Sequence, residues 1–308
     1  MRIVLIGQAA FGAKVLEALL DSGESVIAAY TPPDKPGARP DPLKETAAAR
    51  GIRVVQPGSY KDSKVFDEYR ALAPDLTVMA FVTDIIPPHY FETPVMGTIN
   101  YHPSLLPRHR GGSAINWAVI MGDAQTGLSI FWPDGGIDTG PLLLQEKVDI
   151  GPDDTTGSLY FDRLFPMGVQ AILKSIALIK AGTAPKTPQA EAGATYEPLC
   201  DDKVAQIDWN RPAGDVYNLV RGCDPQPGAY TYCNGEKIRF FNSSLSKQPS
   251  DAVPGTVMKL DDRGMHLAVS GGELTVGRAK TEKGKKLAGA ELAAELGIKP
   301  GDRFTALS

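Results

Sequence analysis

The stretch that decides the fold is residues 2–31, which reads RIVLIGQAAFGAKVLEALLDSGESVIAAYT. Residues 2–6 form an apolar, β-branched run, which is typical of a buried strand. Residues 11–20 then place apolar side chains at helical spacing, and residues 25–31 form a second strand-like run. A strand, a helix and a strand in this order predict the start of a doubly wound, mostly parallel α/β sheet.

The turn at residues 7–12 has a glycine at each end but does not match the GxGxxG fingerprint. It also differs from a P-loop, because Ala13 stands where that motif needs a lysine. We therefore favour a strand-to-helix turn whose glycines permit tight packing over a dinucleotide or ATP site. A nucleotide-binding module without turnover is kept as the alternative from another functional class.

The same patterns divide the rest of the chain into two domains. Further strands are expected at residues 53–55, 76–81, 97–102, 128–132 and 141–148. Helices are expected at residues 43–50, 63–72, 114–121 and 158–181, the last with a break at Pro166. Short strands at 230–233, 238–241, 255–259, 265–269 and 273–278, followed by a helix at 288–296, suggest a small barrel. The expected bounds are 1–185 for the first domain, 186–203 for a linker and 204–308 for the second domain.

Composition excludes several classes of protein. The chain of 308 residues is 43% hydrophobic and 22% charged, as in ordinary soluble proteins. No window approaches the ~20 apolar residues of a membrane helix, and the apolar run at residues 3–6 is too short for a signal peptide. We expect a cytoplasmic protein with no membrane partner.

Charge and cysteine usage argue against nucleic-acid and metal sites. The net charge is −4, and residues 204–308 hold 14 basic and 12 acidic side chains, far from the strong basic field of nucleic-acid binding. Cys200, Cys223 and Cys233 are odd in number and lack CxxC spacing, so neither a disulfide framework nor a zinc site is indicated. No metal is expected.

Three polar residues near the middle of the chain are the catalytic candidates. Asn100 and His102 are two apart, so on a strand they point to the same side. Asp138 lies in a glycine-rich loop, DGGIDTG at 134–140, whose backbone can bend to bring a carboxylate onto a target. An amide, an imidazole and a carboxylate together suit acyl transfer, in which a donor meets a developing oxyanion and the other two groups move protons. His89, His109 and His266 lack such company.

The motifs around these residues resemble the folate-dependent formyltransferase family. They are Asn100-x-His102, the run SLLPRHRG at 104–111 and Asp138-x-Gly140. The family includes methionyl-tRNA formyltransferase, glycinamide ribonucleotide formyltransferase and the hydrolase domain of 10-formyltetrahydrofolate dehydrogenase. The resemblance covers roughly residues 1–245 and extends more loosely to the end. It implies a Rossmann-like catalytic domain and an OB-like β-barrel domain.

The resemblance also implies the co-substrate and its binding residues. The one-carbon donor would be 10-formyltetrahydrofolate, held at the carboxyl edge of the sheet. Donor-binding residues on this basis are Asp84, Ile85, Ile86, Ser104, Leu105, Leu106 and Pro107. Arg108 and Arg110 either bind a phosphate or the folate glutamate tail, or pair with local carboxylates.

The expected mechanism is direct attack on the N10-formyl carbon. Asn100 and protonated His102 would stabilise the oxyanion, and Asp138 would hold His102 or a water and relay the proton to the departing N10.

The formyl acceptor stays open between an amine, water and a charged tRNA. In the tRNA formyltransferases of the family, the loop that corresponds to residues 32–42 is longer and strongly basic. In this chain, Lys35 and Arg39 of that loop are balanced by Asp34 and Asp41. This difference disfavours tRNA, and several segments look closest to the hydrolase domain. That domain has an aliphatic residue in place of Asn100, however, so Asn100 follows the transferase pattern.

Overall fold

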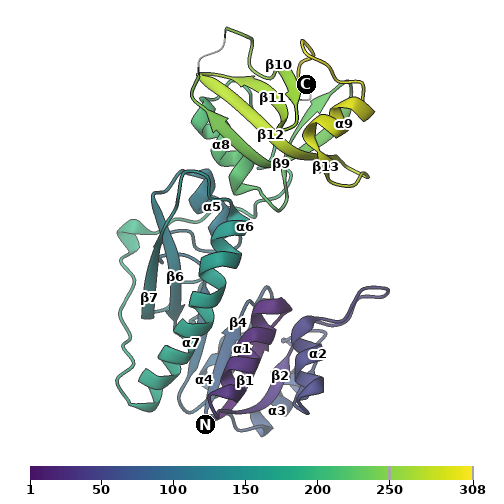
Figure 1. Ribbon diagram of the computed structural model, residues 1–308. Coiled ribbons are helices and arrows are strands. Elements are labelled where there is room, and N and C mark those ends of the chain that lie inside the picture. The colour runs from purple at the N-terminus through teal and green to yellow at the C-terminus, as the bar shows by residue number, and fades with distance from the viewer. Residues whose placement is uncertain (249–250, 307–308) are drawn as a thin grey trace. The chain divides into compact units, whose positions relative to one another are not determined.

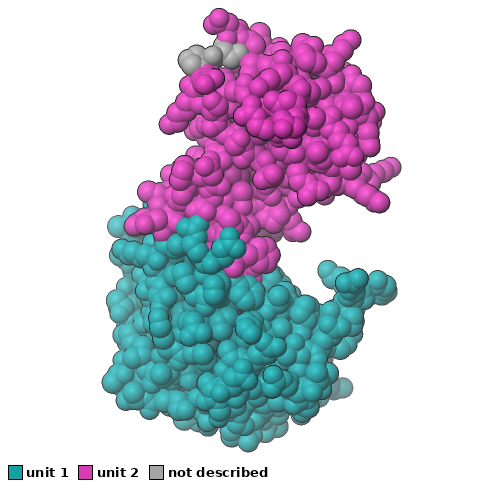
Figure 2. Space-filling view, in the orientation of Figure 1, with its two compact units in different colours: residues 1–111, 127–148, 162–196 teal, residues 112–126, 149–161, 197–308 magenta. Residues whose placement is uncertain are grey.

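The computed structural model describes residues 1–248 and 251–306, and within them the chain forms two compact units (Figure 2). Unit 1 contains residues 1–111, 127–148 and 162–196. Unit 2 contains residues 112–126, 149–161 and the described part of 197–308. The chain therefore passes from one unit to the other several times. The domain bounds expected from the sequence stay a prediction.

Unit 1 is built on a seven-stranded sheet with the order β3-β2-β1-β4-β5-β6-β7 (Figure 1). The strands are β1 (Arg2–Gly7), β2 (Ser25–Tyr30), β3 (Arg53–Val55), β4 (Leu76–Ala80), β5 (Thr98–His102), β6 (Gln125–Phe131) and β7 (Leu142–Asp149). Pairs β1–β2, β1–β4, β2–β3 and β4–β5 are parallel, whereas β5–β6 is antiparallel. The predicted doubly wound, mostly parallel sheet is confirmed, and its order reverses between β1 and β4.

Helices cover both faces of this sheet, because side chains of a strand alternate between its two sides. Ile3 and Leu5 of β1 pack with α1 (Ala9–Asp21), α2 (Pro42–Ala49) and α7 (Phe165–Lys180). Val4 and Ile6 pack on the other face with Tyr69 of α3 (Ser63–Ala71) and with α4 (Pro88–Glu92). Since β1 and β4 are buried on both faces, their sequences are largely apolar; the buried Thr77 of β4 is the exception, and its hydroxyl bonds to that of Tyr69.

The expected helix over 158–181 is interrupted, as its proline predicts. The structure has α6 (Thr156–Ser158), a π-helical turn over Leu159–Leu164, and then α7. Pro166 lies in the first turn of α7, where a missing backbone N–H breaks no helical hydrogen bond. The short helix α4 and a 3₁₀ turn at Glu191–Gly193 were not predicted.

Unit 2 carries a separate antiparallel sheet with the order β10-β11-β12-β9-β8. Its elements are α5 (Ala114–Ile120), α8 (Ala213–Gly222), β8 (Ala229–Cys233), β9 (Glu236–Ser246), β10 (Val257–Asp261), β11 (Gly264–Val269), β12 (Gly272–Thr281), β13 (Leu287–Ala288) and α9 (Gly289–Glu295). The C-terminal segment connects both ends of this path, because Thr305 bonds to Tyr232 of β8 and Asp302 accepts from Val257 of β10. All five predicted strands exist, whereas α8 was missed; the OB-like assignment stays a prediction.

An ion-pair cluster in unit 2 gives a pH-dependent prediction. Arg239 donates to Asp202 at 2.8 and 2.9 Å and Lys237 at 2.5 Å, and these bonds, from Arg239 first, lower the pKa of Asp202 to about 2. Such a carboxylate stabilises the fold above its unfolded pKa of about 4, and that stability is lost as pH falls toward 2. Because 47% of the Asp202 side chain is exposed, we expect Asp202→Asn to cost only about 1 kcal/mol at pH 7.

Urea unfolding of both proteins between pH 7 and pH 2.5 measures this effect, and the difference between them should shrink below about pH 4. Asp262→Asn, at an exposed carboxylate in the turn between β10 and β11, is the matched control. A difference that stays constant with pH would contradict the electrostatic explanation.

Candidate active site

His102 and Asp138 come together at the carboxyl edge of the unit 1 sheet. His102 is the last residue of β5, and its Nδ1 lies 3.4 Å from Asp138 Oδ2. Asp138 itself takes a left-handed φ of +55°, and a side chain at the nearby Gly140 would collide with the Trp132 carbonyl. Both side chains are largely buried, with exposed fractions of 7% and 14%. The two residues therefore form a shielded imidazole–carboxylate pair.

The second ring nitrogen of His102 is held by the backbone. Nε2 lies 2.7 Å from the carbonyl oxygen of His109. A carbonyl only accepts, so the hydrogen-bond pattern assigns a proton to Nε2. This leaves Nδ1, on the Asp138 side, as the nitrogen that gains or loses a proton.

Asp138 is fixed from two directions. The Gly111 N–H donates to its Oδ2 at 2.8 Å, and Gln189 Nε2 donates to its backbone carbonyl at 2.8 Å. Gln189 also donates to the Gly140 carbonyl at 2.7 Å. The carboxylate is thus set in place before any ligand arrives, as preorganised catalysis requires.

Arg110 supports this arrangement and is not available to a ligand. Its guanidinium donates to Gln189 Oε1, to both carboxylate oxygens of Glu191 and to the Tyr196 hydroxyl, at 2.6 to 3.2 Å. These bonds use the five N–H groups that an arginine has, and the side chain is 0% exposed. Two roles were expected for Arg110, binding of a ligand or pairing with a local carboxylate. The structure shows the pairing, with Glu191. We call Arg110, Gln189, Glu191 and Tyr196 the Arg110 clamp.

Asn100 shares the strand and the side of His102. Its side chain is half-buried, and its Oδ1 is buried with no hydrogen-bond partner in the described chain. A buried amide atom without a partner costs free energy, so one expects a ligand or water to complete it. Asn100 Oδ1 therefore offers a hydrogen-bond acceptor to a polar group of a substrate.

Hydrogen bonds to Arg108 and to Ser129 of β6 hold the loop at 104–107. Ser104 Oγ donates to the Arg108 carbonyl at 2.6 Å, and the Leu106 N–H donates to Ser129 Oγ at 3.1 Å. Ser104 and Leu106 are buried, whereas Leu105 and Pro107 are half-buried. Ser104 and Leu106 therefore shape the loop, and Leu105 and Pro107 keep surface for a ligand.

The other predicted donor-binding residues follow β4. Since Met79 of β4 pairs with Asn100 of β5 in parallel, residues 84–86 follow a strand end at the same edge as His102. The Ile85 side chain is 82% exposed, while Ile86 is 5% exposed and packs in the core. An exposed isoleucine at this edge offers an apolar surface for a ring, whereas Ile86 supports the loop from below.

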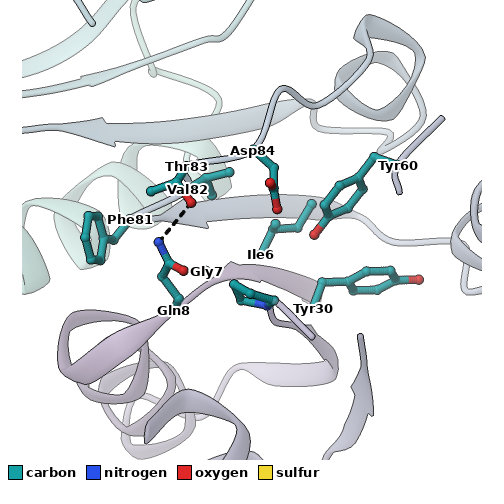
Figure 3. Close-up of a pocket in the computed structure, with 10 residues that line it drawn as sticks. Ile6, Gly7, Gln8, Tyr30, Tyr60, Phe81, Val82, Thr83 and Asp84 are labelled. Atoms are coloured by element: carbon teal, nitrogen blue, oxygen red, sulfur yellow. Dashed lines mark hydrogen bonds between the residues drawn. The ribbon is translucent and has the colours of Figure 1, made fainter. Parts of the chain in front are cut away.

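A pocket lies beside this loop at the ends of β1, β2 and β4 (Figure 3). Its lining consists of Ile6, Gly7, Gln8, Tyr30, Pro32, Tyr60, Phe81, Val82, Thr83 and Asp84. Gln8 Nε2 donates to Thr83 Oγ1 at 3.2 Å across it, and the Asp84 carboxylate points inward near Tyr60 (Figure 3). Burial first, and then the Asp84 charge, raises the pKa of Tyr60, so this hydroxyl stays neutral.

The turn at residues 7–12 is closed to a phosphate. The N–H of Ala9, which begins α1, already donates to both carboxylate oxygens of Asp41, at 3.0 and 2.9 Å. The same carboxylate accepts from Leu43 at the start of α2. A side chain at Gly7 would collide with the Ala80 carbonyl of β4. Tight packing, as favoured from the sequence, explains these glycines.

In residues 1–248 and 251–306 no group of three or more His, Cys, Asp or Glu is placed to hold a metal ion. The same residues include no helix that is long and apolar enough to cross a membrane.

The sequence indicated the catalytic candidates but not their supports. The His109 carbonyl and the Gly111 N–H act through the backbone, which no side-chain pattern reveals. Gln189 was assigned to the linker, although its run QAEAGATY at 189–196 lies within the stretch that resembles the family, which was the available signal.

Comparisons with known proteins agree with this geometry. Residues 1–176 match the formyl transferase family, and residues 201–297 match the formyl transferase C-terminal domain. Cytosolic 10-formyltetrahydrofolate dehydrogenase of Mus musculus is 44% identical over 251 residues, which are 80% of this chain and 28% of that protein. Methionyl-tRNA formyltransferase of Geotalea uraniireducens is 35% identical over 306 residues, which are 98% of this chain and 97% of that protein.

A solved structure extends the likeness to the fold. HypX from Aquifex aeolicus in complex with tetrahydrofolic acid has a TM-score of 0.69 and 19% identity, over 96% of this chain and 47% of that one. The chain spans less than a third of the length of the mouse dehydrogenases that it matches. With both family domains matched in order and a relative similar over nearly its full length, the chain belongs to the folate-dependent formyltransferase family.

Proposed function

We propose that the protein removes the formyl group of 10-formyltetrahydrofolate at Asn100, His102 and Asp138, with water as the first acceptor to consider. The observation that carries this proposal is the geometry of His102, whose Nε2 faces the His109 carbonyl and whose Nδ1 faces a carboxylate fixed by Gly111. An imidazole fixed in this way is ready to exchange a proton at one defined atom.

Each residue then has a distinct role in the step. The Asn100 amide and protonated His102 donate to the formyl oxygen as negative charge develops on it. Because Nε2 is held by the His109 carbonyl, the donor of His102 is Nδ1, whose proton is shared between the oxyanion and Asp138 Oδ2, 3.4 Å away. Asp138 accepts a proton from the attacking water or amine and returns it to N10 as the carbon–nitrogen bond breaks. With water the products are tetrahydrofolate and formic acid, which ionises to formate and one proton, so atoms and charge balance.

Residues of two loops are proposed to hold the donor. The exposed Ile85 and the half-buried Leu105 and Pro107 offer apolar surface, and Asp84 offers a carboxylate to a heterocyclic N–H. Ser104, Leu106 and Ile86 support these loops from within. A flat, partly polar ring such as a pterin suits this combination of apolar contacts and a few polar groups.

The choice of water rests on two observations. The relatives named 10-formyltetrahydrofolate dehydrogenase range from 38 to 44% identity, above the 35% of the tRNA formyltransferase. In the loop at 32–42, Asp34 pairs with Lys44, and Asp41 is used by two helix starts. Acidic groups thus take part in the structure of a loop that would need positive charge to grip a nucleic acid.

Methionyl-tRNA is the second acceptor to consider. The relative of that name is matched along 97% of its length, including its C-terminal part. Asn100 also follows the transferase pattern noted in the sequence. A small amine comes third.

The test follows tetrahydrofolate formation from 10-formyltetrahydrofolate by the purified protein with no acceptor added. Release that His102→Ala abolishes supports water as the acceptor. Binding of the folate without release would contradict it, and charged initiator methionyl-tRNA and then small amines, including amino-sugar nucleotides, would be added next. No folate binding at all would contradict the proposed function itself.

Replacing Asn100 tests its role at the oxyanion. We expect Asn100→Ala to lower kcat about 10²-fold with a smaller change in KM, because the amide acts mainly on charge that develops in the transition state. Steady-state kinetics of formyl release measure this split. Asn100→Asp keeps the shape but removes the donor, so it should be at least as slow; an active aspartate variant would rule out the donor role.

A further inference from the structure

Two cysteines that are far apart in sequence meet in unit 2. The sulfur atoms of Cys200 and Cys223 lie 3.6 Å apart. The sulfur–sulfur bond of a disulfide is about 2.05 Å long, so a shift of about 1.5 Å separates this contact from a covalent bond. Cys233, the third cysteine of the chain, is buried in the same unit.

The fold holds this contact from both sides. The Cys200 N–H donates to Ser113 Oγ at 3.1 Å, and the Pro198 carbonyl accepts from Trp117 Nε1 at 2.6 Å. Cys223 ends α8, where its N–H donates to the Leu219 carbonyl at 2.9 Å and its carbonyl accepts from Gly228 at 2.8 Å. The two thiols therefore meet because their backbones are anchored.

The two thiols differ in access and in chemistry. Cys200 is partly exposed in a segment outside helices and strands, whereas Cys223 is 0% exposed. The hydrogen bond between them lowers the pKa of Cys200, and that bond and burial raise the pKa of Cys223. The accessible thiol is thus the one that forms a thiolate more readily, and thiolates are the reactive form.

A segment without regular structure also permits the small approach that bond formation needs. Cys223 is fixed at a helix end and the Cys200 N–H is held by Ser113, so the approach falls on the Cys200 side chain and not on either backbone. Cys200 packs against the core of unit 2 from one side only, since it is partly exposed.

We propose that Cys200 and Cys223 are a modification site, which a peroxide converts into an intramolecular disulfide. The Cys200 thiolate attacks one peroxide oxygen, the O–O bond breaks, and a sulfenic acid and water form with hydrogen peroxide. The Cys223 sulfur then attacks the Cys200 sulfur and displaces the hydroxyl as a second water. Both thiols are oxidised, and one peroxide is reduced to two waters.

The sequence did not indicate this contact, because Cys200 and Cys223 are neighbours only through the fold of α8 and the segment before it. The proposal does not depend on the formyl-transfer site, since both sulfurs belong to unit 2.

The test treats the native full-length protein with a small excess of hydrogen peroxide and measures its intact mass, and free thiols are blocked only in the portion used for the peptide map. We expect the intact mass to fall by two hydrogen atoms, a peptide map to join Cys200 to Cys223, and dithiothreitol to restore the original mass. Cys233→Ser, the matched control, should behave like the wild type. In Cys223→Ser, the sulfenic acid at Cys200 should persist and react with dimedone.

Three results would overturn the proposal. They are an unchanged mass under conditions that oxidise free cysteine, a bond that includes Cys233 or a second chain, and over-oxidation of Cys200 in the wild type without a disulfide. Should the Cys223→Ser protein fail to fold, the peptide map of the wild type decides by itself.

Discussion

His102→Ala should lower kcat for formyl release by roughly 10³- to 10⁴-fold, since the substitution removes both a proton carrier and an oxyanion donor. His102 is the residue that connects the His109 carbonyl to Asp138, so no neighbour replaces its ring. Single-turnover kinetics with saturating 10-formyltetrahydrofolate measure the chemical step directly.

A chemical role is separable from a structural one in the same variant. Added imidazole should restore part of the activity of His102→Ala if the ring acts in proton transfer, and a merely structural role would not respond. His89→Ala, an exposed histidine on α4, is the control and should keep full activity. Activity of His102→Ala within tenfold of the wild type would remove His102 from the mechanism.

Arg110→Met should destabilise unit 1 by about 3 kcal/mol, because it deletes a fully buried charged group and all of its hydrogen bonds. Gln189 would lose its acceptor role toward the guanidinium, and its hold on the Asp138 carbonyl would loosen. We therefore also expect kcat to fall at least about tenfold at temperatures where the protein is fully folded, as catalytic geometry degrades.

Native-state hydrogen exchange of the β1 and β4 amides measures the stability loss. Arg70→Met is the matched control, since Arg70 is 66% exposed and pairs with Asp67 on the surface of α3; it should change stability by less than about 0.5 kcal/mol. If Arg110→Met and Arg70→Met changed the stability equally, the Arg110 clamp would not contribute to the stability of unit 1.

The predictable part of the fold was the part with a strong hydrophobic pattern. The runs at β1 and β4 are largely apolar, as burial of both faces requires, so the sequence marked both as strands. β9 was expected only over 238–241, because its later residues, Asn242 to Ser244, are polar. Pairing with β12 extends it to Ser246, and such pairing is a tertiary effect that local sequence does not record.

The candidate site was predictable where function depends on side chains. Asn100 and His102 lie two residues apart on β5 and therefore point to the same side, as expected. A glycine-rich loop was expected to bring Asp138 to them. The Asn100–His102–Asp138 assignment itself stays a prediction until the variants are measured. Arg110 was undecidable from the sequence, because its partners Gln189 and Glu191 are about 80 residues away.

The Arg110 clamp determines when, during synthesis, a nascent chain has all the groups that fix its candidate active site. Residues 102–138 leave the ribosome well before residues 189–196, so the sheet edge and the Asp138 loop exist first without the groups that fix them. Competence then arrives only with the segment after α7. A fragment ending at residue 185, the predicted domain bound, would keep the sheet and all three catalytic candidates and yet lack the clamp. The predicted domain bound at residue 185 therefore excludes groups that unit 1, which includes residues 162–196, uses to hold Asp138.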